Sequence, residues 1–266
     1  MDINGLVAEI KKNKKYKDIS DEIVKQRATE YIRKNPNFDG KIAVKDIRKS
    51  LHKAHGSFRG YSKEIKEKIS RKEYKETLKA NRSTRERLDS EIYEDIYSKI
   101  FEITGKPVRI LDLGCGINPV SIPFMGLEWG FEYYAYDIND AEITALNDFF
   151  KIERINGTAR VLDLSNIENI DLLEKNIDVC FMFKVIDVLE EEKKGHKYAE
   201  EMIKKLAKKC KFIVVSFSTR TLSGKAMGHP YRGWIERMLE RIKLEFEVLD
   251  LSDTAGEVFY IIKSNV

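Results

Sequence analysis

The sequence has few cysteines and no long apolar run. Its 266 residues include three cysteines, Cys115, Cys180 and Cys210, an odd number without a CxxC pair, so neither a disulfide framework nor a zinc site is expected. No stretch approaches the roughly 20 uncharged apolar residues that span a bilayer, and no apolar segment of a signal peptide follows the N-terminal lysines. We therefore expect a cytoplasmic protein that has no membrane segment and binds no metal.

Charge of one sign is not in large excess, because 48 Lys and Arg stand against 44 Asp and Glu and leave a net charge of +4. The distribution along the chain is uneven. Residues 1–106 hold 27 basic and 18 acidic side chains, a net +9, which leaves −5 for the remainder. A basic segment of this kind is typical of a surface that binds a polyanion. The alternative is that these lysines lie on solvated helix faces.

The alternating pattern of β-strands is absent from the first hundred residues. Apolar residues recur there at helical spacing, at positions 19, 23, 24 and 28 and again at 88, 92, 96 and 100. Pro36 and Gly40 interrupt the first helical segment, and Gly56 and Gly60 interrupt a later one. The sequence therefore predicts a basic helical domain over residues 1–105.

From Gly105 onward, short apolar runs separated by helical stretches predict an α/β domain over residues 106–266. The predicted strands are Val108–Leu113, Tyr133–Tyr136, Ala159–Leu162, Ile177–Phe183, Phe212–Phe217, Phe246–Leu251 and Val258–Ile262. The first five favour a parallel sheet, whereas the link between the last two is too short for a parallel connection and predicts an antiparallel hairpin. Five parallel strands and an antiparallel pair are typical of the Rossmann-like sheet of class I methyltransferases.

A glycine-rich turn follows the first predicted strand, in the segment Ile110–Gly116. Gly114 and Gly116 lack Cβ atoms, so the backbone can pass close to a ligand at the end of that strand. The third glycine of the dinucleotide fingerprint is absent, since Asn118 and Pro119 follow the turn. This departure disfavours an NAD site that binds pyrophosphate.

Carboxylates stand at the ends of the first three predicted strands: Asp112, Asp137 and Asp163. Asp137 lies roughly 20 residues after the glycine turn, the spacing at which an acid accepts hydrogen bonds from ribose hydroxyls. Asp163, with Leu164 beside it, can meet an adenine amino group. For each acid alone, the alternative is a helix N-cap or a solvated loop end. Since successive strand ends converge on one crevice, the three together predict a cofactor site.

Five further segments carry a family resemblance. They are LHKAHGSF (Leu51–Phe58), STRERL (Ser83–Leu88), LDLGCGINPVSIPFM (Leu111–Met125), FKVIDVLE (Phe183–Glu190) and VSFSTRTLSG (Val215–Gly224). These segments resemble the aminoglycoside-resistance 16S ribosomal RNA (guanine-N7)-methyltransferases. The resemblance implies S-adenosylmethionine as cofactor, the small ribosomal subunit and its 16S rRNA as partner, and N7 of a decoding-site guanine as the methyl acceptor. We expect the enzyme to act as a monomer.

The resemblance also implies that Arg87 reaches the methionine carboxylate of the cofactor, for which a planar guanidinium is suited. The alternative is a helical ion pair between Arg87 and Glu91. Combined with the strand-end residues, the predicted cofactor site consists of Phe58, Asn81, Ser83, Arg87, Asp112, Gly114, Gly116, Asp137, Ile138, Asp163, Leu164, Phe183 and Glu192. Two positions depart from the family pattern: Asp187 replaces a proline, and Glu192 replaces a glutamine. An added carboxylate near RNA or cofactor can change the choice of substrate.

Guanine N7 has a free lone pair and loses no proton on methylation, so its methylation needs no general base. The sequence is consistent with this chemistry, because it lacks the Asn/Asp-Pro-Pro-aromatic tetrapeptide used on exocyclic amines and the Pro-Cys dipeptide of cytosine-C5 enzymes. Lys184, at the end of the fourth predicted strand, is the predicted catalytic residue, where it contacts phosphate or orients the base. The alternative is an ordinary lysine at a strand end.

Basic side chains predict the RNA contacts. They are Arg48, Lys49, Lys53 and Arg59 in the helical domain and Arg220, Lys225 and Arg232 in the loop after the fifth strand. The alternative for that loop is simple solvation. Two other functions stay open: a methyltransferase of a small molecule or protein, and an RNA-binding protein with an inactive cofactor fold. The basic segment disfavours the first, and the intact set of strand-end acids disfavours the second.

Overall fold

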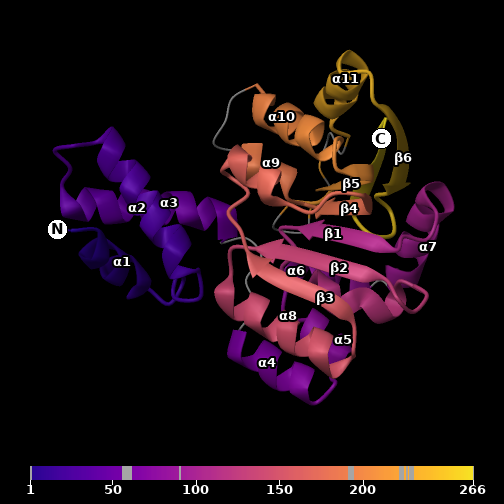
Figure 1. The fold of residues 1–266 in the computed structure, drawn as a ribbon, viewed down its shortest axis with the longest axis horizontal. Helices are drawn as coiled ribbons and strands as arrows, with labels where there is room; N and C mark the ends of the chain where they lie inside the picture. The colour runs from indigo at the N-terminus through magenta and orange to yellow at the C-terminus, as the bar shows by residue number, and fades with distance from the viewer. Residues whose placement is uncertain are drawn as a thin grey trace.

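The computed structural model describes residues 2–55, 62–89, 91–190, 195–221, 225, 227 and 231–265. Its centre is a seven-stranded sheet of order β3-β2-β1-β4-β5-β7-β6 (Figure 1). The strands are β1 (Arg109–Leu113), β2 (Glu132–Asp137), β3 (Asn156–Val161), β4 (Ile177–Phe183), β5 (Cys210–Ser218), β6 (Glu245–Leu251) and β7 (Glu257–Lys263).

Strands β1 to β5 are parallel, and β7 is antiparallel to both β5 and β6. The predicted class I methyltransferase sheet is therefore confirmed. Strand β3 begins at Asn156 rather than at the predicted Ala159, because its first residues carry no apolar signal. The sequence makes no prediction about the order of the two hairpin strands, and in the structure β7 lies between β5 and β6.

Helices cover both faces of the sheet. Successive side chains of a strand point to opposite faces, so each strand contributes apolar side chains to two cores. Ile110 of β1 belongs to the core under α4 (Ser62–Ser70), α5 (Tyr74–Leu78), α7 (Tyr93–Thr104) and α8 (Asp140–Ile152). Its neighbour Leu111 belongs to the opposite core under α10 (Lys197–Leu206) and α11 (Gly233–Arg241). The segments η1 (Asn118–Phe124) and η2 (Ile167–Leu172) are 3-10 helices, and α9 (Ile186–Glu190) and α6 (Arg82–Asp89) lie near the ends of the strands.

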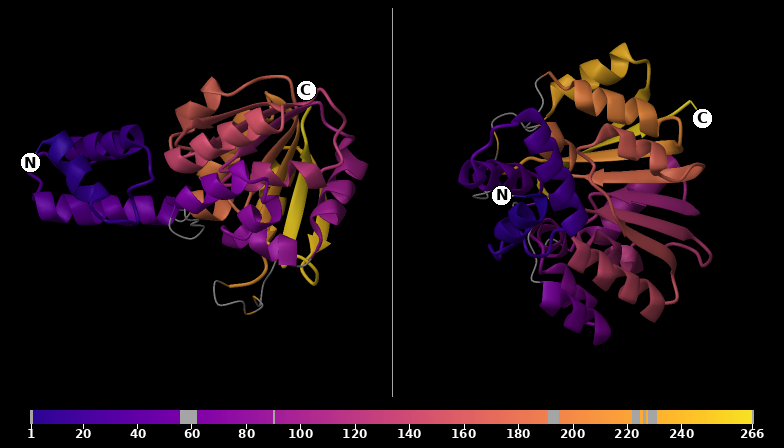
Figure 2. Two further views of the ribbon diagram at one scale, coloured as in Figure 1. Left: turned by 90° about the horizontal axis from the view of Figure 1, so that it is seen from below. Right: turned by 60° about the vertical axis from the view of Figure 1, so that its left-hand side comes forward.

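The first three helices form a separate bundle that projects from the sheet (Figure 2). They are α1 (Ile3–Lys11), α2 (Asp21–Lys34) and α3 (Gly40–His55), and their apolar faces make a core of their own. The remaining N-terminal helices share the core of the sheet. The helices before residue 105 thus pack in two groups, one in the bundle and one on the sheet. The division of the chain into two domains at residue 105 stays a prediction.

None of the described helices combines the length and the apolar character that crossing a bilayer requires. All three cysteines are free and buried. Buried polar and charged side chains lie together at one edge of the sheet, where the parallel strands β1 to β4 end.

Candidate functional site

A pocket lies at the carboxyl edge of the parallel strands and surrounds about 930 Å³ of space, part of it open to solvent. The side chains of one end are polar and come from α6, β1 and the turn after β4. The other end is walled mainly by apolar side chains. The pocket brings together eleven of the predicted cofactor residues: Asn81, Ser83, Arg87, Asp112, Gly114, Gly116, Asp137, Ile138, Asp163, Leu164 and Phe183. Phe58 and Glu192 lie outside the described residues.

The glycine turn after β1 forms the floor of the pocket. Gly114 and Gly116 have φ angles of +63° and +48°, which residues with a Cβ atom rarely adopt. A Cβ atom on Gly114 would lie 2.6 Å from Val185 Cγ2, and one on Gly116 would lie 3.1 Å from Asn81 Nδ2. The turn is therefore restricted to glycine both by its backbone conformation and by its close neighbours.

Asp112 is the penultimate residue of β1 and is almost completely buried. Tyr133 donates a hydrogen bond to its Oδ2 at 2.7 Å, and Asn118 donates a second to the same atom at 2.9 Å. Burial raises the pKa of Asp112 to about 6, although these two hydrogen bonds and the charge of Arg87 act in the opposite direction. The recorded bonds engage one carboxylate oxygen, so the other can accept from a ligand.

Asp137 and Asp163 stand at the ends of β2 and β3. Asp137 accepts the amide of Gly116 at 2.9 Å and that of Asn139 at 3.1 Å, which fixes its carboxylate beside the glycine turn. Asp163 accepts the amide of Ser165 at 2.9 Å and forms an ion pair of 2.9 Å with Arg27 of helix α2. The walls between these acids are apolar, with Ile138, Leu162, Leu164, Val188 and Leu189 lining the pocket.

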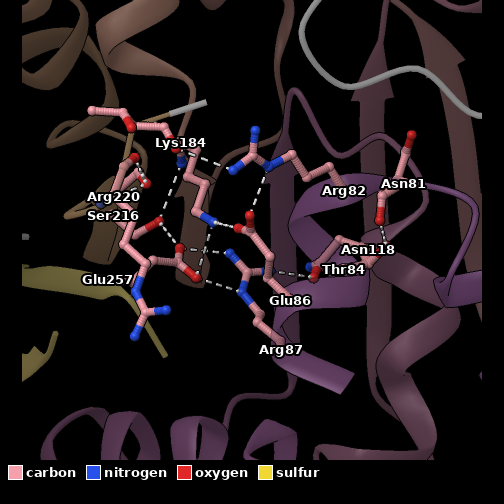
Figure 3. Close-up of polar contacts among 12 residues, drawn as sticks. Asn81, Arg82, Thr84, Glu86, Arg87, Asn118, Lys184, Ser216, Arg220 and Glu257 are labelled. Carbon is pink, nitrogen blue, oxygen red and sulfur yellow. Dashed lines mark hydrogen bonds and ion pairs between the residues drawn. The ribbon is translucent and has the colours of Figure 1, made fainter. Parts of the chain in front are cut away.

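Arg87 lies at the polar end and is fully buried. Its guanidinium binds Glu257 through two bonds, Nε to Oε2 at 2.9 Å and Nη2 to Oε1 at 2.8 Å (Figure 3). Nη1 donates to Asn118 Oδ1 at 3.2 Å, and the guanidinium carbon lies 4.7 Å from the ring centroid of Phe183. The carboxylate partner of Arg87 inside the protein is thus Glu257, at the start of β7, rather than Glu91.

Lys184 follows β4 directly and has a left-handed backbone, with φ at +60°. Its amide donates to Ser216 Oγ at 3.1 Å, and its buried ammonium lies 3.1 Å from Glu86 and 3.5 Å from Glu257. Lys184 lines the pocket, and its charge is engaged by two carboxylates. Its catalytic role stays a prediction.

The recorded ion pairs at this end form a chain of three cations and two carboxylates (Figure 3). Arg82 binds Glu86, Glu86 binds Lys184, and Glu257 joins Lys184 to Arg87. These ion pairs join helix α6 to the ends of β4 and β7. Asn81 lies beside the same end, and its Oδ1 is buried without a hydrogen-bond partner among the described residues. An amino-acid group, with one carboxylate and one ammonium, is complementary to Arg87, Asn81 and Asp112.

The predicted RNA contacts have different surroundings. Lys49 on α3, Arg220 and Lys225 are exposed. Arg48 donates to the backbone carbonyl oxygens of Glu9 and Ile10, so its guanidinium is used within the helical bundle. Arg59 lies outside the described residues, and the described part of Lys53 is its backbone in α3.

Arg232 explains one of the two departures from the family pattern. Its Nη2 binds Asp187 Oδ2 at 2.9 Å, with only 15% of the Arg232 side chain exposed. Asp187 therefore holds the end of the loop after β5 against helix α9. Several other polar residues of the site were not predicted from the sequence: Thr84, Glu86, Asn118, Glu142, Ser216 and Glu257. Asn118 has a local signal, since it directly follows the glycine turn, whereas Glu257 has none.

The sheet order, the glycine turn and the acids at three successive strand ends define a class I, S-adenosylmethionine-dependent methyltransferase fold. Residues 12–261 match the family model described as ribosomal RNA methyltransferase (FmrO). Because the match spans almost the whole chain, the protein belongs to this family.

Relatives and solved structures are similar to this chain over most or all of its length. A 16S rRNA (guanine(1405)-N(7))-methyltransferase of Serratia marcescens is 28% identical over 271 residues and covers 100% of both chains. One of Proteus mirabilis is 27% identical over 247 residues, which are 82% of this chain and 83% of the relative. The structure of the 16S rRNA methyltransferase RmtF with S-adenosyl-L-homocysteine has a TM-score of 0.79 at 25% identity and covers 100% of both chains. The 16S rRNA methylase RmtB has a TM-score of 0.75 at 25% identity, covering 100% of this chain and 99% of that one.

The buried pair of Arg87 and Glu257 generates a stability prediction. Burial alone would raise the pKa of Glu257, but the charges of Arg87 and Lys184 and hydrogen bonds from Arg87 and Ser216 lower it from 4.5 to about 2. This contribution to stability is complete above pH 4.5 and is lost as the pH falls toward 2. Glu257→Gln should lower the free energy of unfolding at pH 7 by about 3 kcal/mol, since Arg87 loses its buried counter-charge.

Urea unfolding at pH 7, 4 and 3 measures both effects. The matched control is Glu245→Gln on β6, because Glu245 is 84% exposed and its ion pair is 3.9 Å long. That variant should unfold like the parent at each pH. A loss below about 1 kcal/mol in Glu257→Gln would contradict the assigned role of the pair.

Proposed function

We propose that this chain transfers a methyl group from S-adenosylmethionine to N7 of a decoding-site guanine in 16S ribosomal RNA. The observation that carries the proposal is the pocket at the carboxyl edge, which contains the three strand-end acids and both glycines of the turn. The chain that forms this pocket is a member of a ribosomal RNA methyltransferase family. The similarity to 16S rRNA (guanine(1405)-N(7))-methyltransferases over the full chain supports the choice of acceptor. Because small ribosomal subunits lie in the cytoplasm, we propose that the enzyme acts there, as a monomer.

The chemistry of the pocket residues fits this cofactor from end to end. At the polar end, Arg87 suits the methionine carboxylate, while Asp112 and Asn81 Oδ1 suit its ammonium group. Asp137 accepts from the ribose hydroxyls, and Asp163 accepts from the adenine amino group between apolar walls. Ser83, Gly114 and Gly116 line the path between them. When bound, S-adenosylmethionine supplies the electrophilic methyl group.

The pocket residues supply position rather than a base. An incoming N7 lone pair must be aligned behind the methyl group, and such alignment can provide a large part of the rate. Phe183 and Lys184 lie at the end of β4, where the acceptor base would enter. Lys184, held by Glu86 and Glu257, orients the base or a nearby phosphate in this proposal. No proton leaves N7, so no side chain has to ionise during the reaction.

The N-terminal bundle and the loop after β5 would contact the RNA. Lys41, Lys45 and Lys49 are spaced four residues apart on α3 and are all exposed, so they form a basic row. Arg220 and Lys225 add exposed charge beside the pocket. Phosphate contacts of this kind supply affinity that is independent of sequence and sensitive to salt.

The product assay tests the acceptor atom. Small subunits incubated with the enzyme and S-adenosylmethionine should acquire 7-methylguanosine at one decoding-site guanine. Methylation at N7 places a positive charge on the purine ring, so the RNA should break at that nucleotide after borohydride and aniline treatment. The single-turnover rate should vary little between about pH 6.5 and 9, because no catalytic base titrates.

A parallel reaction with Asp137→Ala, which lacks the proposed ribose acceptor, controls for dependence on the pocket. Methylated RNA that resists aniline cleavage, or methylation of an adenine or cytosine, would overturn the N7 assignment. Transfer to a small molecule or a protein, with none to the subunit, would overturn the RNA substrate. Absence of any transfer would favour an inactive RNA-binding homologue.

The basic row predicts a salt-dependent change in docking. Replacing Lys41, Lys45 and Lys49 by glutamine should weaken binding to the small subunit and reduce the slope of log affinity against log salt by about 2, because up to three phosphate contacts are lost. Cofactor affinity should not change. The control removes the exposed charges of Lys204, Lys208 and Lys211, which lie in the region of α10 and β5, outside the N-terminal bundle. Equal slopes for the two variants would exclude the row as a docking surface.

Asp112 predicts a pH dependence of cofactor affinity. Its pKa of about 6 means that the carboxylate is protonated at lower pH and then offers no negative charge to the ammonium group. The dissociation constant for S-adenosylhomocysteine, measured by calorimetry, should be constant above about pH 7 and rise about tenfold by pH 5. In Asp112→Asn, affinity should be weak and flat across this range. A parent profile without this rise would show that Asp112 does not bind the ammonium group.

A further inference from the structure

The N-terminal bundle contacts the residues that follow β2 and β3, some of which line the cofactor pocket. Ile19 and Asn139 form an isolated antiparallel β-bridge. The amide of Ser20 donates to the carbonyl oxygen of Ile138 at 3.2 Å, and the amide of Asp140 donates to that of Asp18 at 3.0 Å. The bundle therefore binds, through backbone hydrogen bonds, the segment that follows Asp137, the proposed acceptor of the ribose hydroxyls.

Ile138 belongs to both structures. It lines the pocket and is also a member of the apolar core formed by the three helices of the bundle. It is 9% exposed, so its side chain is packed between the two. A displacement of the bundle would have to move this pocket wall.

Arg27, on helix α2 of the bundle, makes the polar contact at the same place. Its Nη2 lies 2.9 Å from Oδ2 and 3.2 Å from Oδ1 of Asp163, and it also donates to Ser165 Oγ. The Arg27 side chain is 13% exposed and that of Asp163 is 5% exposed, so solvent screens the pair only weakly. Arg27 Nε is buried and has no partner among the described residues. The hydrogen bonds of Arg27 thus come from Nη2, and they converge on the Asp163 carboxylate and Ser165.

Asp163 is otherwise held by few groups. Ser165 supplies a backbone amide to Oδ1, and Asn169 Nδ2 binds the backbone carbonyl oxygen of Asp163 at 2.8 Å. The recorded bond to Oδ2 is the one from Arg27. Arg27 therefore contacts both carboxylate oxygens, whereas the Ser165 amide reaches one of them.

We infer that Arg27 is a positioning residue for recognition of the adenine ring, contributed to the cofactor site by the N-terminal bundle. The inference rests on the proposed role of Asp163 as acceptor of the adenine amino group. Arg27 does not line the pocket; it orients the carboxylate that does. Through this contact and Ile138, the segment proposed to dock on RNA also forms the outer support of the cofactor site.

The test compares two ligands that differ at one position of the base. S-adenosylhomocysteine carries a 6-amino group that donates to Asp163, whereas S-inosylhomocysteine carries a carbonyl oxygen there, which a carboxylate repels. Dissociation constants for both are measured by calorimetry on the full chain without RNA. The parent should prefer the adenine ligand at least about tenfold, because the inosine ligand replaces a hydrogen bond to the buried carboxylate by repulsion between two oxygen atoms.

Arg27→Ala should weaken the adenine ligand about tenfold and the inosine ligand less than about twofold, so that the preference almost disappears. Arg27→Lys, which keeps the charge but loses the planar fork, should retain part of the preference. Lys25→Ala removes a charge from an exposed position on the same helix and should behave like the parent. A general loosening of the fold would weaken both ligands alike and leave their ratio unchanged.

An unchanged ratio in Arg27→Ala therefore overturns the inference, whether or not affinity falls. A full preference retained in Asp163→Asn overturns it as well, because Asp163 would then not read the adenine. Neither result would change the outcome expected in the product assay, because ligand discrimination is measured without RNA. If the product assay showed no methylation at N7 of guanine, the measured ratios of ligand affinity would still hold. The two proposals can therefore be refuted independently.

Discussion

The buried ion pair between Arg87 and Glu257 is the interaction on which the site depends. Removing two charges from water costs several kcal/mol for each, and the cost is offset only when geometry is good and further hydrogen bonds are present. Here both carboxylate oxygens face the guanidinium, Ser216 adds a third bond at 2.8 Å, and Lys184 adds a second cation. The pair thereby joins helix α6 to β7 and, through its partners, to the ends of β4 and β5. A flexible surface arginine in the same place would have to be ordered by each ligand.

The pocket separates its functions along its length. The polar end combines Arg87 and Lys184 with the buried acid Asp112, while Asp137 and Asp163 lie further along, beside apolar walls. A fixed carboxylate in such walls discriminates strongly, because a ligand that presents an acceptor to it replaces a hydrogen bond by repulsion. Selectivity for one cofactor therefore does not require many contacts. It requires that each acid be held still. Backbone amides hold Asp137, and the Ser165 amide together with Arg27 holds Asp163.

The sequence predicted the features whose signals are local. Asp112, Asp137 and Asp163 each stand next to a recognisable strand, so the topology of the sheet sufficed to bring them together. The partners that hold site residues could not be predicted in this way. Glu257 is 170 positions from Arg87, and Arg27 is 136 positions from Asp163, with no pattern to connect them. Charge alone also fails to separate surface from interior, since Arg48 and Arg232 are engaged by carbonyl oxygens and by Asp187.

Strand β7 lies between β5 and β6 although it is the last element of the chain. Strand β7 pairs with a neighbour along each of its two edges, and Glu257 stands at its start. Displacing Glu257 would therefore require two ladders of backbone hydrogen bonds to break together. Fraying at this edge of the sheet would begin at β6, the outermost strand, and would leave the counter-charge of Arg87 in place.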